Sequence, residues 1–294
     1  MHPTALQYKL IKKIKDERFD EDLIHQYSLL VHIGSRDLQV GVIDGEHRVV
    51  LLEDYVFPSL SSHQELTQLL DHLFDSHAFL KAAFWKTIKV SLKNNKFVQV
   101  PATLFLEEAK PEYLRFNARI EDDEDVLSIE NRQAKAVTVF AMQRELKDWL
   151  KSLYPNNAPV FMHQSAVLIE GVTQYSATQK ENPLYIYVDR FKLHILFCRN
   201  GNLLYYNQFV IKQFSDYIRY IMLVMKSLNL NQRTSQIMLW GYIGKNSPHY
   251  HEFYKYINNV IFGQRPKDLG FGYLFDEVQD HHFFDLYSMH FLGQ

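Results

Sequence analysis

Two stretches of the chain carry side chains that can grip phosphate and Mg²⁺. The first is HIGSRD, which begins at His32 and forms the bend between two apolar runs. A glycine such as Gly34 lets backbone N–H groups approach a phosphate oxygen, and the Ser35 hydroxyl adds a hydrogen bond. Mg²⁺ prefers oxygen ligands, which Asp37 offers and the neutral imidazole of His32 does not. The sequence predicts a phosphate-binding hairpin with an incomplete metal shell.

The second stretch is DRFK, which begins at Asp189. Asp189 supplies a carboxylate, but the Phe191 side chain would block close approach of a phosphate to the backbone. A third stretch, GYIG, runs from Gly241 to Gly244 and places Tyr242 between glycines that could support a flat ring. Phe191 and Tyr242 thus place bulky side chains in these two stretches.

Basic residues stand at both bends. Arg36 and Lys192 could bind an anion by charge instead of through the backbone. Turn residues of this kind are usually solvated, so we expect both side chains to be exposed.

Other reactive patterns are weaker. The 14 histidines are densest in HYH (249–251) and DHHFFD (280–285), but residues one or two apart do not converge on a helix. No C-x-x-C or H-E-x-x-H occurs, so we expect no metal site. The sequence also lacks a G-x-S-x-G elbow and a P-loop. Cys198 lies in the apolar run HILFC, where a buried side chain is expected rather than a nucleophile.

The composition is that of an ordinary globular protein. The chain has 294 residues, 47% hydrophobic and 22% charged, with a net charge of −2. This balance argues against nucleic-acid or membrane binding by the whole molecule. A single cysteine, no secretory signal and no long apolar run together predict a cytoplasmic protein.

The elements that must position these residues occur twice. Residues 29–57 alternate like a three-stranded antiparallel meander, with a tight turn at Asp44-Gly45. A helix capped by Ser61 or Ser62 follows, and then a strand near residues 87–92. The order restarts at Leu184 with strand, bend, strand, turn, strand, helix and strand.

This repeat predicts two lobes of like topology, each βββαβα, joined near residues 171–183. The first lobe is expected over residues 27–175 and the second over residues 176–294. We expect an N-terminal arm or short helix over residues 1–26, because its apolar residues have helical spacing.

Two duplicated lobes that each open with a hairpin resemble the actin-like ATPase fold, a ribonuclease H-like α/β fold shared by actin, sugar kinases and Hsp70-type chaperones. More narrowly, FVQVPATLFLEEAKPEYLRFN and HHFFDLYSMHFLG are similar to a family of Bacteroidetes proteins of unknown function with that fold. The resemblance covers the chain from about Tyr27 onwards. It implies two lobes around a cleft and leaves the activity open.

Working members of this superfamily carry a pattern close to D-x-G-x-x-x-T on each hairpin and a later G-G pair for adenosine. Each motif is half present here, because His32 replaces an aspartate, Phe191 a glycine and Tyr242 one glycine of the pair. The resemblance implies a vestigial nucleotide site made of Gly34, Ser35, Asp37, Asp189, Gly241 and Gly244. It also implies that Phe191 and Tyr242 block the space that a nucleotide would need.

The sequence favours a degenerate actin-like protein that does not hydrolyse ATP. It would act as a binding or scaffold module for an unknown protein partner, with no catalytic residue and no cofactor. The alternative is a divergent ATPase or kinase that still binds ATP and Mg²⁺ in the inter-lobe cleft. A nucleic-acid partner ranks lower, because no domain has a basic excess.

Overall fold

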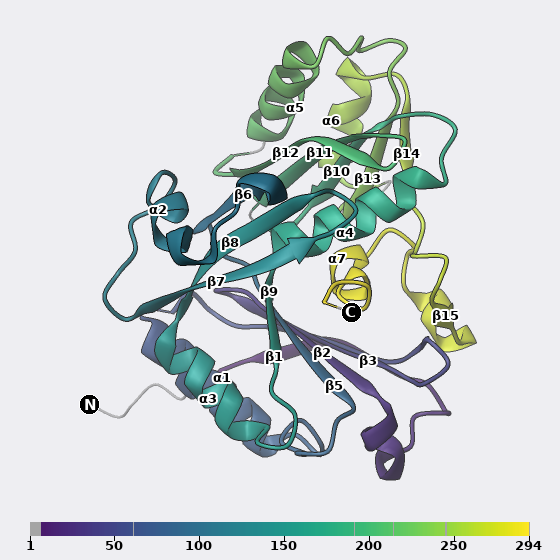
Figure 1. Ribbon diagram of the computed structural model, residues 1–294. Coiled ribbons are helices and arrows are strands. Elements are labelled where there is room, and N and C mark those ends of the chain that lie inside the picture. The colour runs from purple at the N-terminus through teal and green to yellow at the C-terminus, as the bar shows by residue number, and fades with distance from the viewer. Residues whose placement is uncertain (1–6, 61, 191, 214, 245, 294) are drawn as a thin grey trace.

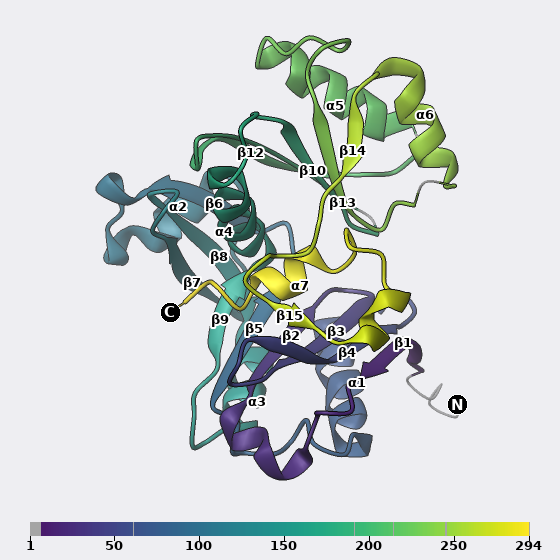
Figure 2. The same ribbon diagram turned by 90° about the vertical axis from the view of Figure 1, so that its right-hand side faces the viewer.

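Two mixed β-sheets form the cores of two lobes, and two helices lie between them (Figure 1, Figure 2). The computed structural model describes residues 7–60, 62–190, 192–213, 215–244 and 246–293, but not the side chains of residues 248, 249 and 252.

The sheet of the first lobe is built around the meander expected from the sequence. Its strands run in the order β1-β4-β3-β2-β5-β9, and the short β15 also pairs with β4. β2 is antiparallel to β3 and parallel to β5. The strand bounds are β1 Lys9–Lys15, β2 Ser28–Ile33, β3 Asp37–Ile43, β4 Arg48–Val56, β5 Thr87–Leu92, β9 Val160–His163 and β15 Gly270–Phe271.

The sheet of the second lobe repeats this arrangement. Its order is β12-β11-β10-β13-β14, which matches β4-β3-β2-β5-β9 position by position and in strand direction. The duplication predicted from the sequence is therefore confirmed. The strand bounds are β10 Leu184–Val188, β11 Lys192–Arg199, β12 Asn202–Val210, β13 Ile237–Gly241 and β14 Val260–Phe262.

Helices cover the outer face of each sheet. α1 (His63–Ser76) and α3 (Arg144–Leu153) pack on the first sheet, and α5 (Ser215–Ser227) and α6 (Pro248–Tyr256) pack on the second. The Ser62 side chain accepts a hydrogen bond from Glu65 N at 3.2 Å and caps α1. Ser62 is one of the two predicted caps, and the other, Ser61, lies outside the described residues.

Two helices fill the layer between the lobes. α4 (Gln164–Ala177) and α7 (Phe284–Ser288) contribute to the inner cores of both sheets. They cross closely at Gly171, where an added Cβ would lie 2.1 Å from Ser288 Oγ. The lobes thus share a packed central layer instead of meeting only at a hinge.

A small third sheet stands beside the first lobe. Its order is β6-β8-β7, with α2 against it. Short 3₁₀ segments complete the described elements. The bounds are β6 Phe97–Pro101, α2 Lys110–Arg115, β7 Glu124–Asn131, β8 Ala136–Gln143 and 3₁₀ turns at Glu21–Gln26, Ala102–Leu104, Glu107–Ala109 and Tyr273–Glu277.

The chain ends differ from the sequence expectation. Lys9–Lys15 form an edge strand, β1, rather than an arm or short helix, because they pair with β4 along its length. The last part of the predicted second lobe, 176–294, also leaves that lobe: β15 pairs with β4, and Leu286 and Tyr287 of α7 pack in a core of the first lobe.

Candidate functional site

The two hairpins face each other at the ends of β2 and β10, and they have the same register. Ile33 pairs with Leu38, and Val188 pairs with Leu193. The turns close in the same way, since Gly34 N donates to Asp37 O at 2.8 Å and Asp189 N donates to Lys192 O at 2.9 Å.

This register corrects the sequence alignment of the two motifs. Asp189 occupies the place of Gly34, and the counterpart of His32 is Tyr187. Lys192 in turn occupies the place of Asp37. The second hairpin therefore has an aspartate at the glycine position and a tyrosine at the aspartate position.

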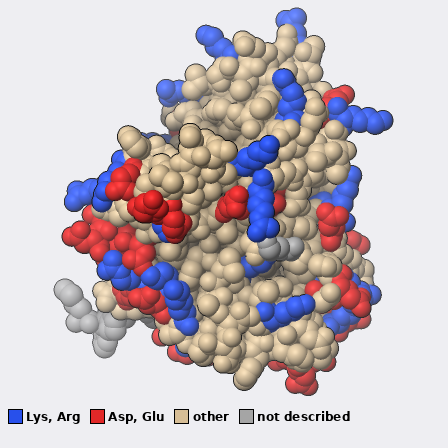
Figure 3. All heavy atoms as spheres, viewed as in Figure 1, with Lys and Arg blue, Asp and Glu red and all other residues tan. Residues whose placement is uncertain are grey.

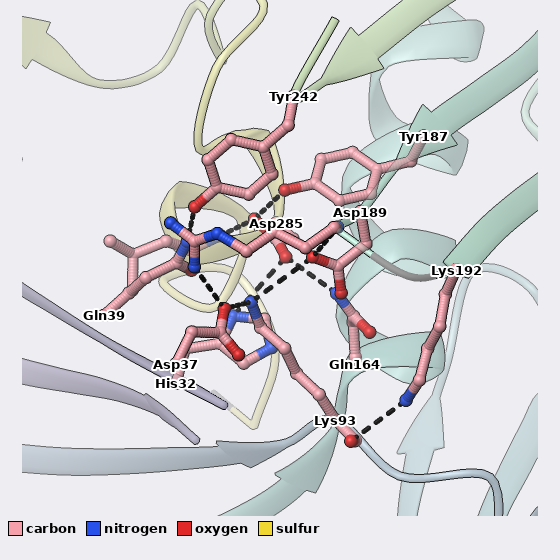
Figure 4. A network of polar contacts seen from close by, with 12 residues as sticks. His32, Asp37, Gln39, Lys93, Gln164, Tyr187, Asp189, Lys192, Tyr242 and Asp285 are labelled. Carbon is pink, nitrogen blue, oxygen red and sulfur yellow. Dashed lines mark hydrogen bonds and ion pairs between the residues drawn. The ribbon is translucent and has the colours of Figure 1, made fainter. Parts of the chain in front are cut away.

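A buried lysine joins the two hairpins. Lys93 follows β5, and its Nζ lies 2.7 Å from Asp37 Oδ2 and 3.8 Å from Asp189 Oδ1, with the Lys93 side chain only 2% exposed. Figure 4 shows Lys93 extended between the carboxylates of the two lobes. An ion pair this deeply buried holds the lobes in one relative position, because separating it would leave unpaired charges.

Arg190 makes a second bridge. Its Nη1 donates to Asp37 Oδ2 at 2.8 Å and its Nη2 to Asp54 Oδ2 at 2.7 Å. The guanidinium lies over the Tyr242 ring, 4.3 Å from its centroid, and Gln39 donates to the Tyr242 hydroxyl. A side chain of the second lobe thus forms ion pairs on two strands of the first.

A polar cluster lies beneath these ion pairs. Gln164, at the start of α4, donates to Asp189 Oδ2 at 3.1 Å and to Asp285 Oδ2 at 2.9 Å. Tyr187 donates to the other oxygen of Asp285, and His32 Nδ1 lies 3.5 Å from Asp285 Oδ2. The residues at the two aspartate positions of the motif both contact one carboxylate from α7.

Burial and neighbouring charges set the pKa values of this network. Burial raises the pKa of Asp54 to about 6 despite Arg190, and it also raises the pKa of Asp285. Burial opposes the charge of Asp189, but Lys93 together with the other groups around the carboxylate outweighs burial and lowers the pKa of that carboxyl. Burial likewise lowers the pKa of Lys192 to about 8 and keeps the pKa of His32 well below its usual value. Burial is thus the largest influence on each of these pKa values, and only for Asp189 do the neighbouring groups reverse its direction.

The space left between the hairpins is small. A cavity of about 50 Å³ remains there. Gly34 itself is crowded by its own turn, since an added Cβ would lie 1.9 Å from Asp37 Oδ1. The cavity is lined by Gly34, Ser35, Arg36, Asp37, Lys93, Asp189, Arg190 and Lys192.

The predicted site residues divide into two groups. Gly34, Ser35, Asp37 and Asp189 lie together around this cavity. Gly244 lines a separate hollow of about 620 Å³ with Ser247 and His281. Gly241 has a φ of 94°, and its N–H donates to His281 O at 2.7 Å, so no ligand is needed to satisfy it.

The expected blocking and basic residues have mixed outcomes. Tyr242 lies between the lobes, within reach of Gln39 and Asp54 of the first lobe, whereas Phe191 lies outside the described residues. Arg36 is exposed as expected. The expectation for Lys192 is wrong, because its Nζ turns inward and donates to Lys93 O at 3.0 Å and Asn94 O at 3.2 Å.

Most of the network was missed by sequence reasoning. Asp285 was considered only within the histidine-rich segment, and Arg190 only as a neighbour of Asp189. The available signal for these residues was a single polar side chain next to an apolar strand. Lys93 directly follows β5, and Gln164 directly follows β9. The residues missed are Gln39, Asp54, Lys93, Gln164, Tyr187, Arg190 and Asp285.

The described residues include neither a metal-binding cluster nor a membrane-spanning helix. Among the described side chains, no group of three or more His, Cys, Asp or Glu residues is arranged to hold a metal ion. No helix in the described ranges is long and apolar enough to cross a bilayer. Cys198 is buried, and burial raises the pKa of its thiol to about 12.

Comparison with known proteins places this architecture in a family. A Bacteroides thetaiotaomicron protein "with actin-like ATPase fold and unknown function" is 25% identical, with a TM-score of 0.74 over 83% of this chain and 93% of that chain. The "PilM-PilN type IV pilus biogenesis complex" is 12% identical, with a TM-score of 0.58 over 89% of this chain and 97% of that chain. No curated protein matches the chain. Residues 16–260 match the model of the family described as "Protein of unknown function (DUF3822)", so the chain belongs to that family and has the actin-like ATPase fold.

Proposed function

We propose that this protein does not hydrolyse ATP and works as a binding module for a protein partner. The observation that carries the proposal is the ion-pair network of Lys93 and Arg190 with Asp37, Asp54 and Asp189, which occupies the space between the hairpins. The cavity of about 50 Å³ that remains is far below the roughly 300–1,000 Å³ of small-molecule sites.

The charge of the network also opposes a bound triphosphate. Phosphate oxygens between the hairpins would face the carboxylates of Asp37, Asp54 and Asp189. Of the four cations that line the cavity, Lys93 and Arg190 are already paired with those carboxylates, and Lys192 donates to two backbone carbonyls. Nucleotide entry would therefore require breaking buried ion pairs, which is costly when one partner stays buried.

Three observations favour a protein partner. An apolar hollow of about 270 Å³ lies beside the first hairpin, with Leu66, Leu92, Met142 and Leu146 in its wall, and could take apolar side chains. On the face seen in Figure 3, acidic and basic side chains are interspersed, without the single-sign surface that nucleic-acid binding favours. The PilM-PilN complex, which has the same fold, is a protein–protein assembly.

ATP with Mg²⁺ is expected to leave the melting temperature unchanged. A ligand at a hundred times its Kd would add about 2.7 kcal/mol to the free energy of unfolding, which a melting curve detects readily. The measurement compares millimolar ATP with and without Mg²⁺, and phosphate release is followed in parallel. A magnesium-dependent rise in melting temperature, or phosphate release above that of a heat-inactivated sample, would contradict the proposal.

A divergent ATPase or kinase is the second candidate. It is favoured by the hollow of about 620 Å³ that Gly244 lines, which is large enough for a small molecule. A shift with ATP that does not depend on Mg²⁺ would point to this hollow. It would then indicate nucleotide binding without the metal-dependent chemistry of the hairpins.

A further inference from the structure

The free edges of the three sheets are protected in different ways, with one exception. An unpaired strand edge exposes backbone N–H and C=O groups that can pair with another chain, and proteins block it with lysines, proline, acidic residues or short strands. β1 carries four lysines in KLIKKIK, β6 ends at Pro101, and β7 carries Glu124, Asp125 and Glu130. β9 and β14 have only four and three residues.

β12 has none of these devices, although its Gln208 N–H donates to the Asn207 side chain at 2.9 Å. It stands at the end of its sheet, with β11 on one side and no strand among the described residues on the other, and it forms one margin of the upper sheet in Figure 2. Its nine residues, NLLYYNQFV, include no charged residue and no proline. Leu204 and Val210 are 55% and 44% exposed.

The geometry of β12 suits pairing with a further strand. Its register with β11 is regular from Tyr205 to Val210, and the single irregularity leaves Leu204 unpaired at the start of this segment. One face is held by the ring of Phe209, which stacks on Tyr220 of α5 with centroids 4.5 Å apart. The other face is held by Gln208, which donates to Asn95 Oδ1 at 2.6 Å. The strand is therefore a fixed template rather than a loose edge.

We propose that β12 pairs with β12 of a second copy of this chain, antiparallel and about a two-fold axis at Asn207. Such pairing places Tyr205 opposite Phe209 and Leu204 opposite Val210 of the other copy. Aromatic and apolar cross-strand pairs of this kind stabilise antiparallel sheets. Because β12 has no charged residue, the two-fold axis brings no like charges together. The strand is therefore self-complementary. Isologous contacts about a two-fold axis are the commonest form of homo-oligomer.

This inference does not depend on whether the inter-lobe cleft binds nucleotide. The β12 edge lies on the second lobe, and its residues form no part of the ion-pair network. Either result of the ATP measurement leaves it standing.

Sedimentation of the full chain at micromolar concentration tests the proposal. We expect a species of twice the 34.9 kDa chain mass. Asn207→Lys places two like charges opposite each other at the axis, and we expect it to weaken association about tenfold or more. The control is Ile11→Lys, which adds a lysine at an exposed position of the other long edge, β1, and should leave the dimer unchanged.

A mixing experiment identifies the axis itself. Asn207→Lys and Asn207→Asp variants should each associate weakly, whereas their mixture should associate more tightly than either alone, because opposite charges then face each other. Circular dichroism and melting curves confirm that both variants are folded. The proposal is overturned by a monomeric wild-type chain, by an Asn207→Lys dimer as tight as wild type, or by a mixture no tighter than its components.

Discussion

Lys93→Met is expected to lower the free energy of unfolding by about 3–5 kcal/mol, the usual cost of removing one member of a buried ion pair. Methionine keeps most of the length of the lysine side chain but leaves Asp37 and Asp189 without their shared cation. Burial lowers the affinity of Lys93 for its proton, but Asp189 and Asp37 outweigh burial and raise its pKa, so the lysine is charged at neutral pH. Denaturant unfolding near neutral pH measures the loss.

A surface ion pair provides the matched control. Lys81 Nζ lies 3.0 Å from Asp71 Oδ1, and about a third to a half of each side chain is exposed. Lys81→Met is expected to cost about 0–1 kcal/mol, as exposed pairs do. If Lys93→Met costs no more than this control, the network does not hold the lobes together.

A double variant tests whether the residues act as one unit. Asp37→Asn removes the carboxylate that both Lys93 and Arg190 contact. In the double variant with Lys93→Met, the combined loss should be smaller than the sum of the single losses, because the unpaired charge is removed with its partner. Simple additivity would mean that the two residues stabilise the protein independently.

The repeated sheets were predictable because their signals are local. Alternating apolar residues and turn signals define the meanders. Asn200 and Gly201 both adopt positive φ, as the predicted tight turn requires. The first turn is longer than the predicted Asp44-Gly45 turn, because Asp44 N donates to Arg48 O at 2.9 Å and the positive φ falls on His47. β1 was not predictable in the same way. Its lysines and apolar residues fit a helix as well as a strand, and only pairing with β4 decides between the two.

The site was less predictable because it depends on contacts between distant segments. Asp285 lies 98 positions after Tyr187, to which it is hydrogen-bonded, and Lys93 lies 56 positions after Asp37. No local pattern marks such pairs. The register of the second hairpin could not be predicted from the sequence either. Asp189 lies two residues from the motif position, and only the strand pairing shows that it is equivalent to Gly34.

Acidification is expected to destabilise the protein strongly, because several histidines are buried in neutral form. His32, His163 and His194 are fully buried. Burial lowers the pKa of His194 to about 3 and lowers the pKa values of His32 and His163 well below their usual value. Burial also lowers the pKa values of His282 and His290 to about 4.

The direction of the effect follows from proton binding. A histidine with a lowered folded-state pKa favours folding fully above its unfolded pKa of about 6.5, and this contribution is lost as the pH falls below that value. At about pH 5, one such histidine costs about 2 kcal/mol relative to neutral pH. The raised pKa of Asp54, about 6, acts in the opposite direction, since its proton binds more tightly in the folded state and adds about 1 kcal/mol at the same pH.

Because five histidines oppose the two carboxyls with raised pKa values, Asp54 and Asp285, we expect a net loss of stability between about pH 6.5 and pH 4.

His194→Gln isolates one contribution. The glutamine can still hydrogen-bond to the Tyr206 hydroxyl, which lies 2.9 Å from His194 Nδ1, but it binds no proton. The free energy of unfolding, measured in urea at both ends of this range, should fall by about 3 kcal/mol less in the variant than in the wild type. His25→Gln, at an exposed position, should leave the pH dependence as it is. An unchanged slope in His194→Gln would mean that this histidine is protonated within the folded protein, and that a buried cation beside Asp189 is part of the native network.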